Sequence, residues 1–192
     1  MNRSQILKIA EEHSFLVNRF FDRCAEDVSR VATRIVRCVQ QGGKILLFGN
    51  GGSAADAQHI AAELTGRFEK DRPAVAAIAL TCDTSALTAI ANDTGFEQIF
   101  SRQIEALGRK GDLAIAISTS GQSPNVIQGV RTAREHDIET IGLLGREGGE
   151  LRAMVDHAIV VGAQKTSRIQ EIHILLGHIL CEAVETELFQ PR

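Results

Sequence analysis

Apolar positions divide the chain into a helical first part and an alternating remainder. Between residues 5 and 41 they recur at helical spacing, which predicts two helices, residues 5–23 and 25–41, and Gly42-Gly43 ends the second. Beyond this point, helical patterns alternate with short apolar runs of the kind found in buried parallel strands. The five predicted strands are residues 44–48, 75–80, 113–117, 140–144 and 158–161.

The segments between and after the strands predict helices. They cover residues 54–65, 85–91, 98–107, 125–136, 149–154 and 167–188. Such alternation indicates a parallel sheet with helices on both faces. The sequence therefore predicts a single α/β domain, residues 1–192, in which a five-stranded, doubly wound parallel sheet (about 42–192) follows an N-terminal helical extension (about 1–41). We expect a ligand outside the carboxyl ends of the strands.

Composition and charge indicate which binding partners and which cellular compartment to expect. The chain has 192 residues, a net charge of −3 and scattered Lys and Arg residues, so we expect neither a nucleic-acid nor a membrane partner. The four cysteines are far apart and form no CxxC pair, which is typical of reduced thiols in a cytoplasmic protein. The first residues predict an amphipathic helix rather than a secretory signal, and no apolar run reaches the length of a membrane span.

The first predicted strand runs into a glycine-rich turn, Gly49-Asn50-Gly51-Gly52-Ser53. Glycines permit backbone angles that other residues avoid, and the helix that follows would point its free amide groups at an anion. Ser53 is the expected helix N-cap, with Asp56 completing a pattern like a capping box. The alternative is a tight structural turn, since the pattern matches neither of the common nucleotide-binding motifs.

A second loop of this kind follows the third strand and strengthens the prediction of a phosphate site. Pro124 suits the first position of a helix, so Ser123 becomes its N-cap. Hydroxyl groups and amides at a helix start hold a phosphate without fixed positive charge. The hydroxyls belong to Ser118, Thr119, Ser120 and Ser123. The alternative is a loop whose hydroxyls only cap the helix, but two such loops in one sheet favour phosphate binding.

Two helices carry residues suited to a metal ion. His59 and Glu63 are four residues apart and share a helix face, and Gln170 and His178 are eight apart on the last helix. If both pairs converge on one pocket, imidazole and oxygen ligands favour zinc. Taken singly, each of these side chains is more often structural or solvated. His173 lies about 140° around the helix from His178 and is excluded from this site.

Five stretches together resemble the phosphoheptose isomerases, single-domain members of the sugar isomerase (SIS) fold, which is flavodoxin-like. The resemblance runs over nearly the whole chain. It implies interconversion of D-sedoheptulose 7-phosphate and D-glycero-D-manno-heptose 7-phosphate, the first step toward the heptose of bacterial lipopolysaccharide, in a cytoplasmic homotetramer with one zinc ion per subunit. The stretches are Gly49-Asn50-Gly51-Gly52-Ser53, Glu63-Leu64-Thr65-Gly66-Arg67-Phe68, Ala91-Asn92-Asp93, Ile117-Ser118-Thr119-Ser120-Gly121-Gln122-Ser123 and Arg168-Ile169-Gln170-Glu171-Ile172-His173.

The resemblance assigns roles to individual positions. It implies Glu63 and His178 as the acid/base pair. The implied metal ligands are His59, Glu63, Gln170 and His178, and the implied substrate contacts are Asn50, Gly51, Gly52, Glu63, Asn92, Asp93, Ser118, Thr119, Ser120, Ser123 and Gln170.

The chemistry of aldose–ketose isomerisation fits these roles. Glu63 would move a proton between neighbouring carbons, His178 would serve the oxygens, and zinc would polarise the carbonyl. Two other readings of the resemblance remain open: a non-enzymatic tetramer of the kind that associates with the DnaA initiator, and a sugar-phosphate sensor without turnover. The last helix and the N-terminal helices are more apolar than one sheet face requires, which predicts a homotetramer with sites at subunit interfaces and Arg67 directed at a neighbour's substrate.

Overall fold

Five parallel strands form the centre of the protein, as predicted. The structure is a computed structural model and describes residues 1–189. The strands are β1 (Ile45–Gly49), β2 (Ala77–Ala79), β3 (Leu113–Ser118), β4 (Glu139–Gly145) and β5 (His157–Val161), in the order β2-β1-β3-β4-β5. This is the doubly wound, flavodoxin-like order, in which a ligand binds where the direction of winding reverses, next to β1 and β3.

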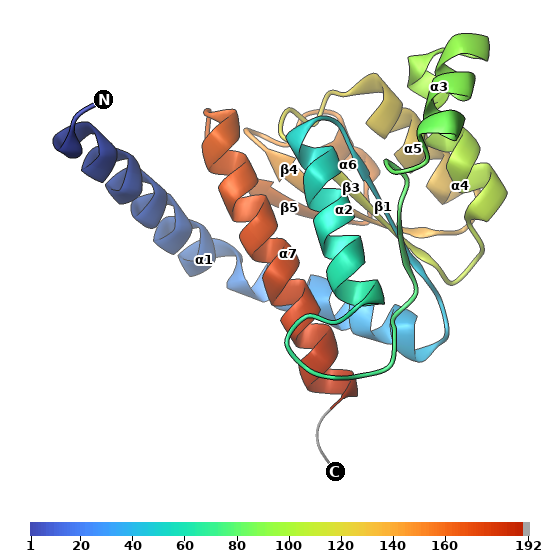
Figure 1. Cartoon of the computed structure of the whole chain (residues 1–192), viewed down its shortest axis with the longest axis horizontal. Coiled ribbons are helices and arrows are strands. Elements are labelled where there is room, and N and C mark those ends of the chain that lie inside the picture. The colour runs from blue at the N-terminus through green and yellow to red at the C-terminus, as the bar shows by residue number, and fades with distance from the viewer. Residues whose placement is uncertain (190–192) are drawn as a thin grey trace.

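Helices cover both faces of the sheet (Figure 1). They are α1 (Arg3–Gln40), α2 (Gly52–Thr65), α3 (Thr84–Asp93), the 3-10 turn η1 (Phe96–Gln98), α4 (Ser101–Leu107), α5 (Pro124–Glu135), α6 (Leu151–Met154) and α7 (Thr166–Leu188). None of the helices within residues 1–189 is both long and apolar enough to cross a membrane.

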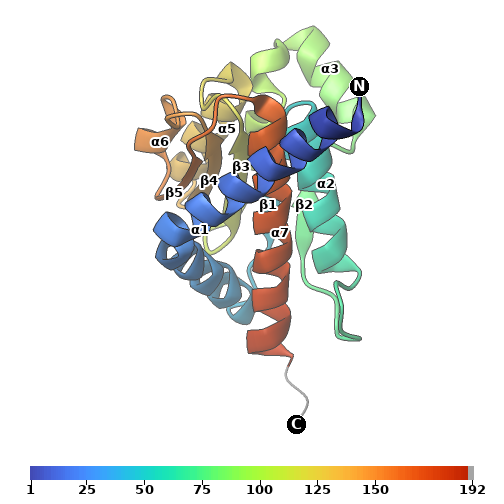
Figure 2. The same ribbon diagram turned by 90° about the vertical axis from the view of Figure 1, so that its left-hand side faces the viewer.

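Alternating side chains of the strands feed two separate cores. Along β1, Ile45 and Leu47 face the core shared with α1, α2 and α7, whereas Leu46 and Phe48 face the core shared with α4 and α5. All four side chains are fully buried, because a strand at the centre of a parallel sheet is covered on both faces. Figure 2 shows α7 and α2 side by side in front of the strands, with α1 crossing them.

The N-terminal extension is one helix, not the two predicted. No glycine or proline interrupts the sequence around Cys24, so α1 continues for 38 residues from its N-cap at Asn2. Its buried apolar side chains lie only between Phe20 and Cys38. In the first half Ile6 and Phe15 are 55% and 63% exposed, and this half projects beyond the sheet in Figure 1.

Three other predicted elements are shortened or divided in the structure. The predicted strand 75–80 reduces to Ala77–Ala79, since the amide of Val75 donates to Leu64 O at the end of α2. The predicted helix 98–107 divides into η1 and α4. The predicted helix 149–154 begins only at Leu151, because Gly148 and Gly149 have φ of 92° and 54°, outside the right-handed helical region.

Candidate active site

The first glycine-rich turn ends β1 and starts α2. The predicted cap at Ser53 is wrong: the N-cap is Gly51, with φ of 58°, and Ser53 is the second residue of the helix and buried. Glycine tolerates this left-handed conformation, and its use here moves the helix start two residues earlier. No side chain of the described residues caps α2, so its first amides face the carboxyl edge of the sheet without a side-chain acceptor.

A pair of amide side chains joins the first loop to the second. Asn50 Nδ2 donates to Asn125 Oδ1 and Asn125 Nδ2 donates to Asn50 Oδ1, both at 2.8 Å. Asn125 is 2% exposed and was not among the residues predicted for the site. Its one signal in the sequence was an amide directly after Pro124, at the start of a helix. The pairing holds the two loops at a fixed separation.

The second loop folds its hydroxyls inward at the start of α5. Ser123 is the N-cap and Pro124 the first helical residue, as predicted. Ser118 Oγ accepts from the amide of Gly121 at 3.1 Å and lies 3.3 Å from Ser123 Oγ. Ser120 Oγ accepts from the amide of Gln122, also at 3.1 Å. These contacts hold the loop in one conformation through hydrogen bonds of its own hydroxyls and amides.

The turn between β4 and α6 packs against the second loop. A Cβ atom at Gly121 would lie 1.9 Å from the carbonyl oxygen of Gly148, so only glycine permits this approach. The amide of Leu151 donates to Gly121 O at 3.1 Å. The turn between β4 and α6 therefore fixes the loop backbone.

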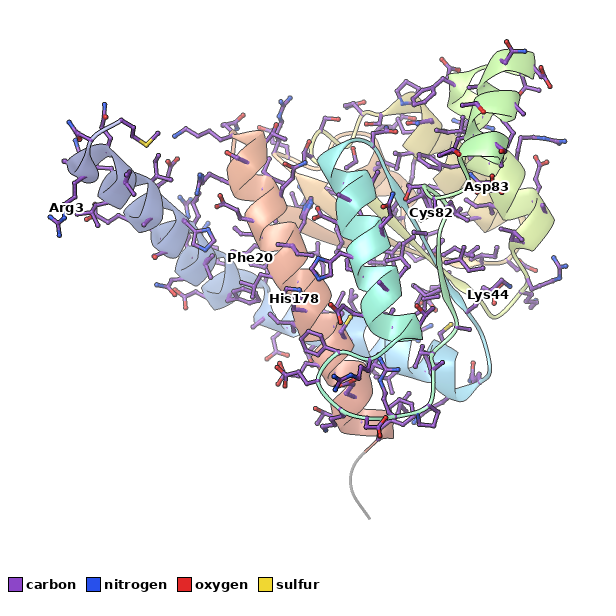
Figure 3. The ribbon with its side chains drawn as sticks, viewed as in Figure 1. Arg3, Phe20, Lys44, Cys82, Asp83 and His178 are labelled. Atoms are coloured by element: carbon purple, nitrogen blue, oxygen red, sulfur yellow. The ribbon has the colours of Figure 1, made fainter. Side chains whose placement is uncertain are left out.

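His59, Glu63 and His178 meet between α2 and α7. His59 Nε2 lies 3.2 Å from Glu63 Oε1 and 3.4 Å from His178 Nε2. The side chains of His59 and Glu63 are 46% and 26% exposed, so the cluster borders solvent. His178 points from α7 toward α2 in Figure 3.

Two further residues hold His178 in this position. Gly177 lets the helices approach so closely that a Cβ there would lie 2.6 Å from two carbons of Ile60 on α2. On its other side, His178 stacks on Phe68, with ring centroids 5.6 Å apart and planes inclined by 29°. Neither contact follows from a local sequence pattern, since both depend on how α2 and the loop after it pack on α7.

Two distances in this cluster match the donor spacing of zinc. Two ligands about 2.0–2.1 Å from a tetrahedral zinc ion lie about 3.3 Å apart, close to both distances from His59 Nε2. The cluster does not form a complete metal site in one chain, because within residues 1–189 no three His, Cys, Asp or Glu side chains surround one metal-sized centre. Two imidazoles and a carboxylate are borderline ligands that suit zinc.

Gln170 stands apart from the other three predicted ligands. Its side chain lies against Gly52, where an added Cβ would be 2.2 Å from Gln170 Nε2. Gln170 and His178 are eight residues apart, or about 12 Å along α7. In one chain the side chain of Gln170 therefore lies beside the first loop, whereas that of His178 lies in the cluster with His59 and Glu63.

Asn92 and Asp93 also lie away from the cluster. They end α3, are exposed, and bind each other through Asn92 Nδ2 and Asp93 Oδ1 at 2.8 Å. Figure 1 shows α3 at the far side of the sheet from α7.

Asp56 on α2 and His173 on α7 are among the titratable side chains whose pKa values are displaced. Burial raises the pKa of Asp56 to about 6, against the opposing effect of His59, and Asp56 Oδ2 is buried without a hydrogen bond. Burial lowers the pKa of His173 to about 4, and its Nε2 lies 3.2 Å from Leu144 O. His173 is fully buried on the sheet-facing side of α7, away from His178, in keeping with its exclusion from the predicted site.

Similarity to known proteins identifies the family of this chain. Residues 10–145 match the SIS domain family. A phosphoheptose isomerase of Desulfovibrio desulfuricans is 53% identical over 181 residues, which are 94% of this chain and 86% of that protein. One from Aquifex aeolicus is 51% identical over 94% of this chain and 95% of its own length. The structure of phosphoheptose isomerase GmhA from Neisseria gonorrhoeae superposes with a TM-score of 0.91 at 45% identity, covering 96% of this chain and 98% of that one. The chain belongs to the phosphoheptose isomerase family of the SIS fold.

Proposed function

We propose that this protein interconverts D-sedoheptulose 7-phosphate and D-glycero-D-manno-heptose 7-phosphate, the step that supplies heptose for bacterial lipopolysaccharide. Family membership over nearly the whole chain supports the activity. The observation that carries the mechanism is the cluster of Glu63 and His178 on either side of His59. A cytoplasmic location agrees with the four cysteines, which are all free thiols.

Isomerisation requires one proton to move between two neighbouring carbons and another between their oxygens. Glu63 is the carboxylate of the cluster and takes the carbon-bound proton from one carbon and returns it to the next. His178 passes a proton between the two oxygens through one ring nitrogen, which donates when the imidazole is protonated and accepts when it is neutral. The stack on Phe68 and the contact with His59 hold the His178 ring in place for this transfer.

We assign a zinc ion to His59, Glu63, His178 and Gln170, one per subunit. The donor types and the two distances at His59 Nε2 support this ion. When bound, zinc supplies Lewis-acid polarisation of the carbonyl oxygen.

The substrate phosphate binds at the carboxyl edge of the sheet. Gly49 of β1 pairs with Ile117 of β3, so the two loops that follow these strands open side by side. The helix starts of α2 and α5 direct their amides toward this edge. The proposed contacts are Asn50, Gly51, Gly52, Ser118, Thr119, Ser120 and Ser123, with Asn92 and Asp93 contacting the sugar.

One chain places these two parts at opposite ends of α2. Gly52 and Glu63 are eleven residues apart in α2, or about 16 Å along its axis. A heptulose 7-phosphate spans seven bonds from its carbonyl carbon to phosphorus, or about 9 Å when extended. Contacts of about 3 Å at each end and the lean of the Glu63 side chain toward the helix start bring only a fully extended substrate to this distance, not a bent one. We therefore assign the phosphate loops and the base of each site to different subunits.

A site shared between subunits also explains two features of the single chain. Gln170 lies beside Gly52 of the first loop and would supply the fourth metal ligand to the cluster of a neighbouring subunit. The exposed apolar side chains in the first half of α1 suit burial against other copies. Both support a homotetramer with sites at its interfaces, and Arg67 in the exposed loop after α2 would reach a neighbour's substrate.

Turnover of sedoheptulose 7-phosphate by Glu63→Gln tests the mechanism. The substitution keeps the size of the side chain and removes the base, so we expect kcat to fall about 10²–10⁴-fold with binding retained. Wild-type turnover in this variant would contradict the role of Glu63. A wild-type protein that binds the sugar phosphate without converting it would instead favour the sensor, and one that does neither would favour the initiator-associating reading.

Mixing two inactive variants tests the shared site. Ser120→Asp places a carboxylate against the phosphate, and Glu63→Gln removes the base. In a shared site, one subunit's intact loop meets the other's intact base, so mixed oligomers recover about a quarter of wild-type activity at random assembly. Without such recovery after unfolding and joint refolding, the site belongs to one chain.

A further inference from the structure

A buried carboxylate near the end of α7 organises the irregular loop that follows α2. Glu185 is 2% exposed and accepts from the backbone amides of Phe68, Glu69 and Lys70 at 2.9–3.0 Å. Its Oε1 also accepts from Arg72 Nε at 2.8 Å. Burial raises the pKa of Glu185, but these amides and the guanidinium outweigh it and hold the pKa below its usual value.

The guanidinium of Arg72 connects this carboxylate to the end of α2. Its side chain is 1% exposed, with Nη2 donating to the backbone oxygen of Glu63 at 2.7 Å and Nη1 to that of Leu64 at 2.9 Å. The last carbonyls of a helix lack partners within the helix, and a cation there complements the helix dipole. Arg72 thus bonds directly to the backbone of the proposed base.

The same loop also reaches the second proton-transfer residue. Phe68, whose amide Glu185 holds, stacks on the imidazole of His178. Glu185 and His178 are seven residues apart on α7, on nearly the same face. Both proposed catalytic side chains are therefore connected to one buried ion pair, Glu63 through its backbone and His178 through its ring.

We propose that Arg72 and Glu185 are positioning residues for the isomerisation, setting the distance between the Glu63 carboxylate and the His178 imidazole. The inference rests on the roles proposed above for Glu63 and His178. If the pair had only a structural role, substituting Arg72 or Glu185 would lower stability but leave kcat unchanged in the folded protein.

Arg72→Lys is the main test. Lysine keeps a positive charge beside Glu185 but has a single nitrogen, so it cannot bind the carboxylate and two carbonyls together. Misplacement of a reacting group by about 1 Å costs about 10²-fold in rate, so we expect kcat to fall about 10–100-fold, with KM within about twofold of wild type. Measurements are made well below the melting temperature of each variant.

Asp112→Asn is the matched control. Asp112 is another buried carboxylate that accepts from two backbone amides, those of Lys44 and Arg109, and pairs with the Lys44 ammonium. None of its partners belongs to the proposed site. We expect this variant to lose melting temperature as Arg72→Lys does and to keep wild-type kcat. Equal losses of kcat in the two variants would overturn the inference.

A double variant separates positioning from general loosening. If Arg72 acts through Glu63, then adding Arg72→Lys to Glu63→Gln lowers the residual rate by no more than about twofold, since the positioned group is already absent. A full additional 10–100-fold loss would show that Arg72 acts elsewhere.

Phe68→Leu tests the connection to His178, because Arg72 is buried and Arg72→Lys risks misfolding. In this variant kcat is expected to fall at least about threefold by displacement of the imidazole. Wild-type kcat in either folded variant overturns the inference.

The outcomes also distinguish this inference from the proposed function. Wild-type turnover in Glu63→Gln would remove the mechanism itself. An inactive Glu63→Gln beside a fully active Arg72→Lys would remove only the positioning role.

Discussion

The close approach of α2 to α7 at Gly177 gives the sharpest test of how the site is assembled. In Gly177→Ala the new Cβ would lie 2.6 Å from Ile60 Cγ1 and Cδ1, whereas carbon atoms in contact are about 3.5–4.0 Å apart. Ile60 is 2% exposed, so its branched stem has little room to turn away. We expect the helices to separate by about 1 Å at a cost of about 1–3 kcal/mol in stability.

This shift would act directly on the neighbouring His178. Its Nε2 now lies 3.4 Å from His59 Nε2, and a shift of about 1 Å moves the pair beyond the spacing that zinc requires. We expect the content of the proposed zinc ion to fall and kcat to drop by about tenfold or more. The assay is turnover of sedoheptulose 7-phosphate, with metal quantified on the purified protein by atomic emission.

A compensating substitution distinguishes helix separation from general instability. Ile60→Ala in the Gly177→Ala background removes both carbons that meet the new Cβ, so kcat and zinc content should recover. The same change deletes buried apolar atoms and costs a further 2–5 kcal/mol or so of stability. Activity and stability therefore move in opposite directions. Full activity in Gly177→Ala, or a double variant that stays inactive while folded, would refute the reasoning.

Three further outcomes are expected from single substitutions. Ser120→Ala should raise KM for the sugar phosphate, losing about 1–2 kcal/mol of binding with little change in melting temperature; the reverse pattern would leave the loop a purely structural turn. His173 has its pKa lowered to about 4, so the unfolded chain binds its proton more tightly and stability is lost as pH falls from about 6.5 toward 4; His173→Gln should flatten that part of a urea-melting profile, and an unchanged slope would exclude His173 as its cause. Phe15→Glu should dissociate the proposed homotetramer in light scattering, together with loss of activity if sites are shared, whereas an active monomer would remove both ideas.

The sequence by itself determined the fold and the local surroundings of most candidate residues. Period-two and period-3.6 patterns report which side of a strand or helix is buried, so the five strands and the order of elements followed from them. The start of α5 at Pro124 was equally local, because proline suits the first turn of a helix. The break predicted within α1 and the cap predicted at Ser53 failed for a local reason too: similar patterns fit a continuous helix and a glycine cap.

Only the tertiary structure decided which of these residues meet. His59 and His178 are 119 residues apart, and Asn50 and Asn125 are 75 apart, so no periodicity records either contact. The first depends on the missing side chain at Gly177, which sets the distance between two helices. The separation of Gln170 from the cluster follows from the rise of α7, which a spacing of eight residues conceals until the helix is seen beside α2. Helical spacing fixes the direction of a side chain from its own axis, whereas the distance between axes depends on packing across the core.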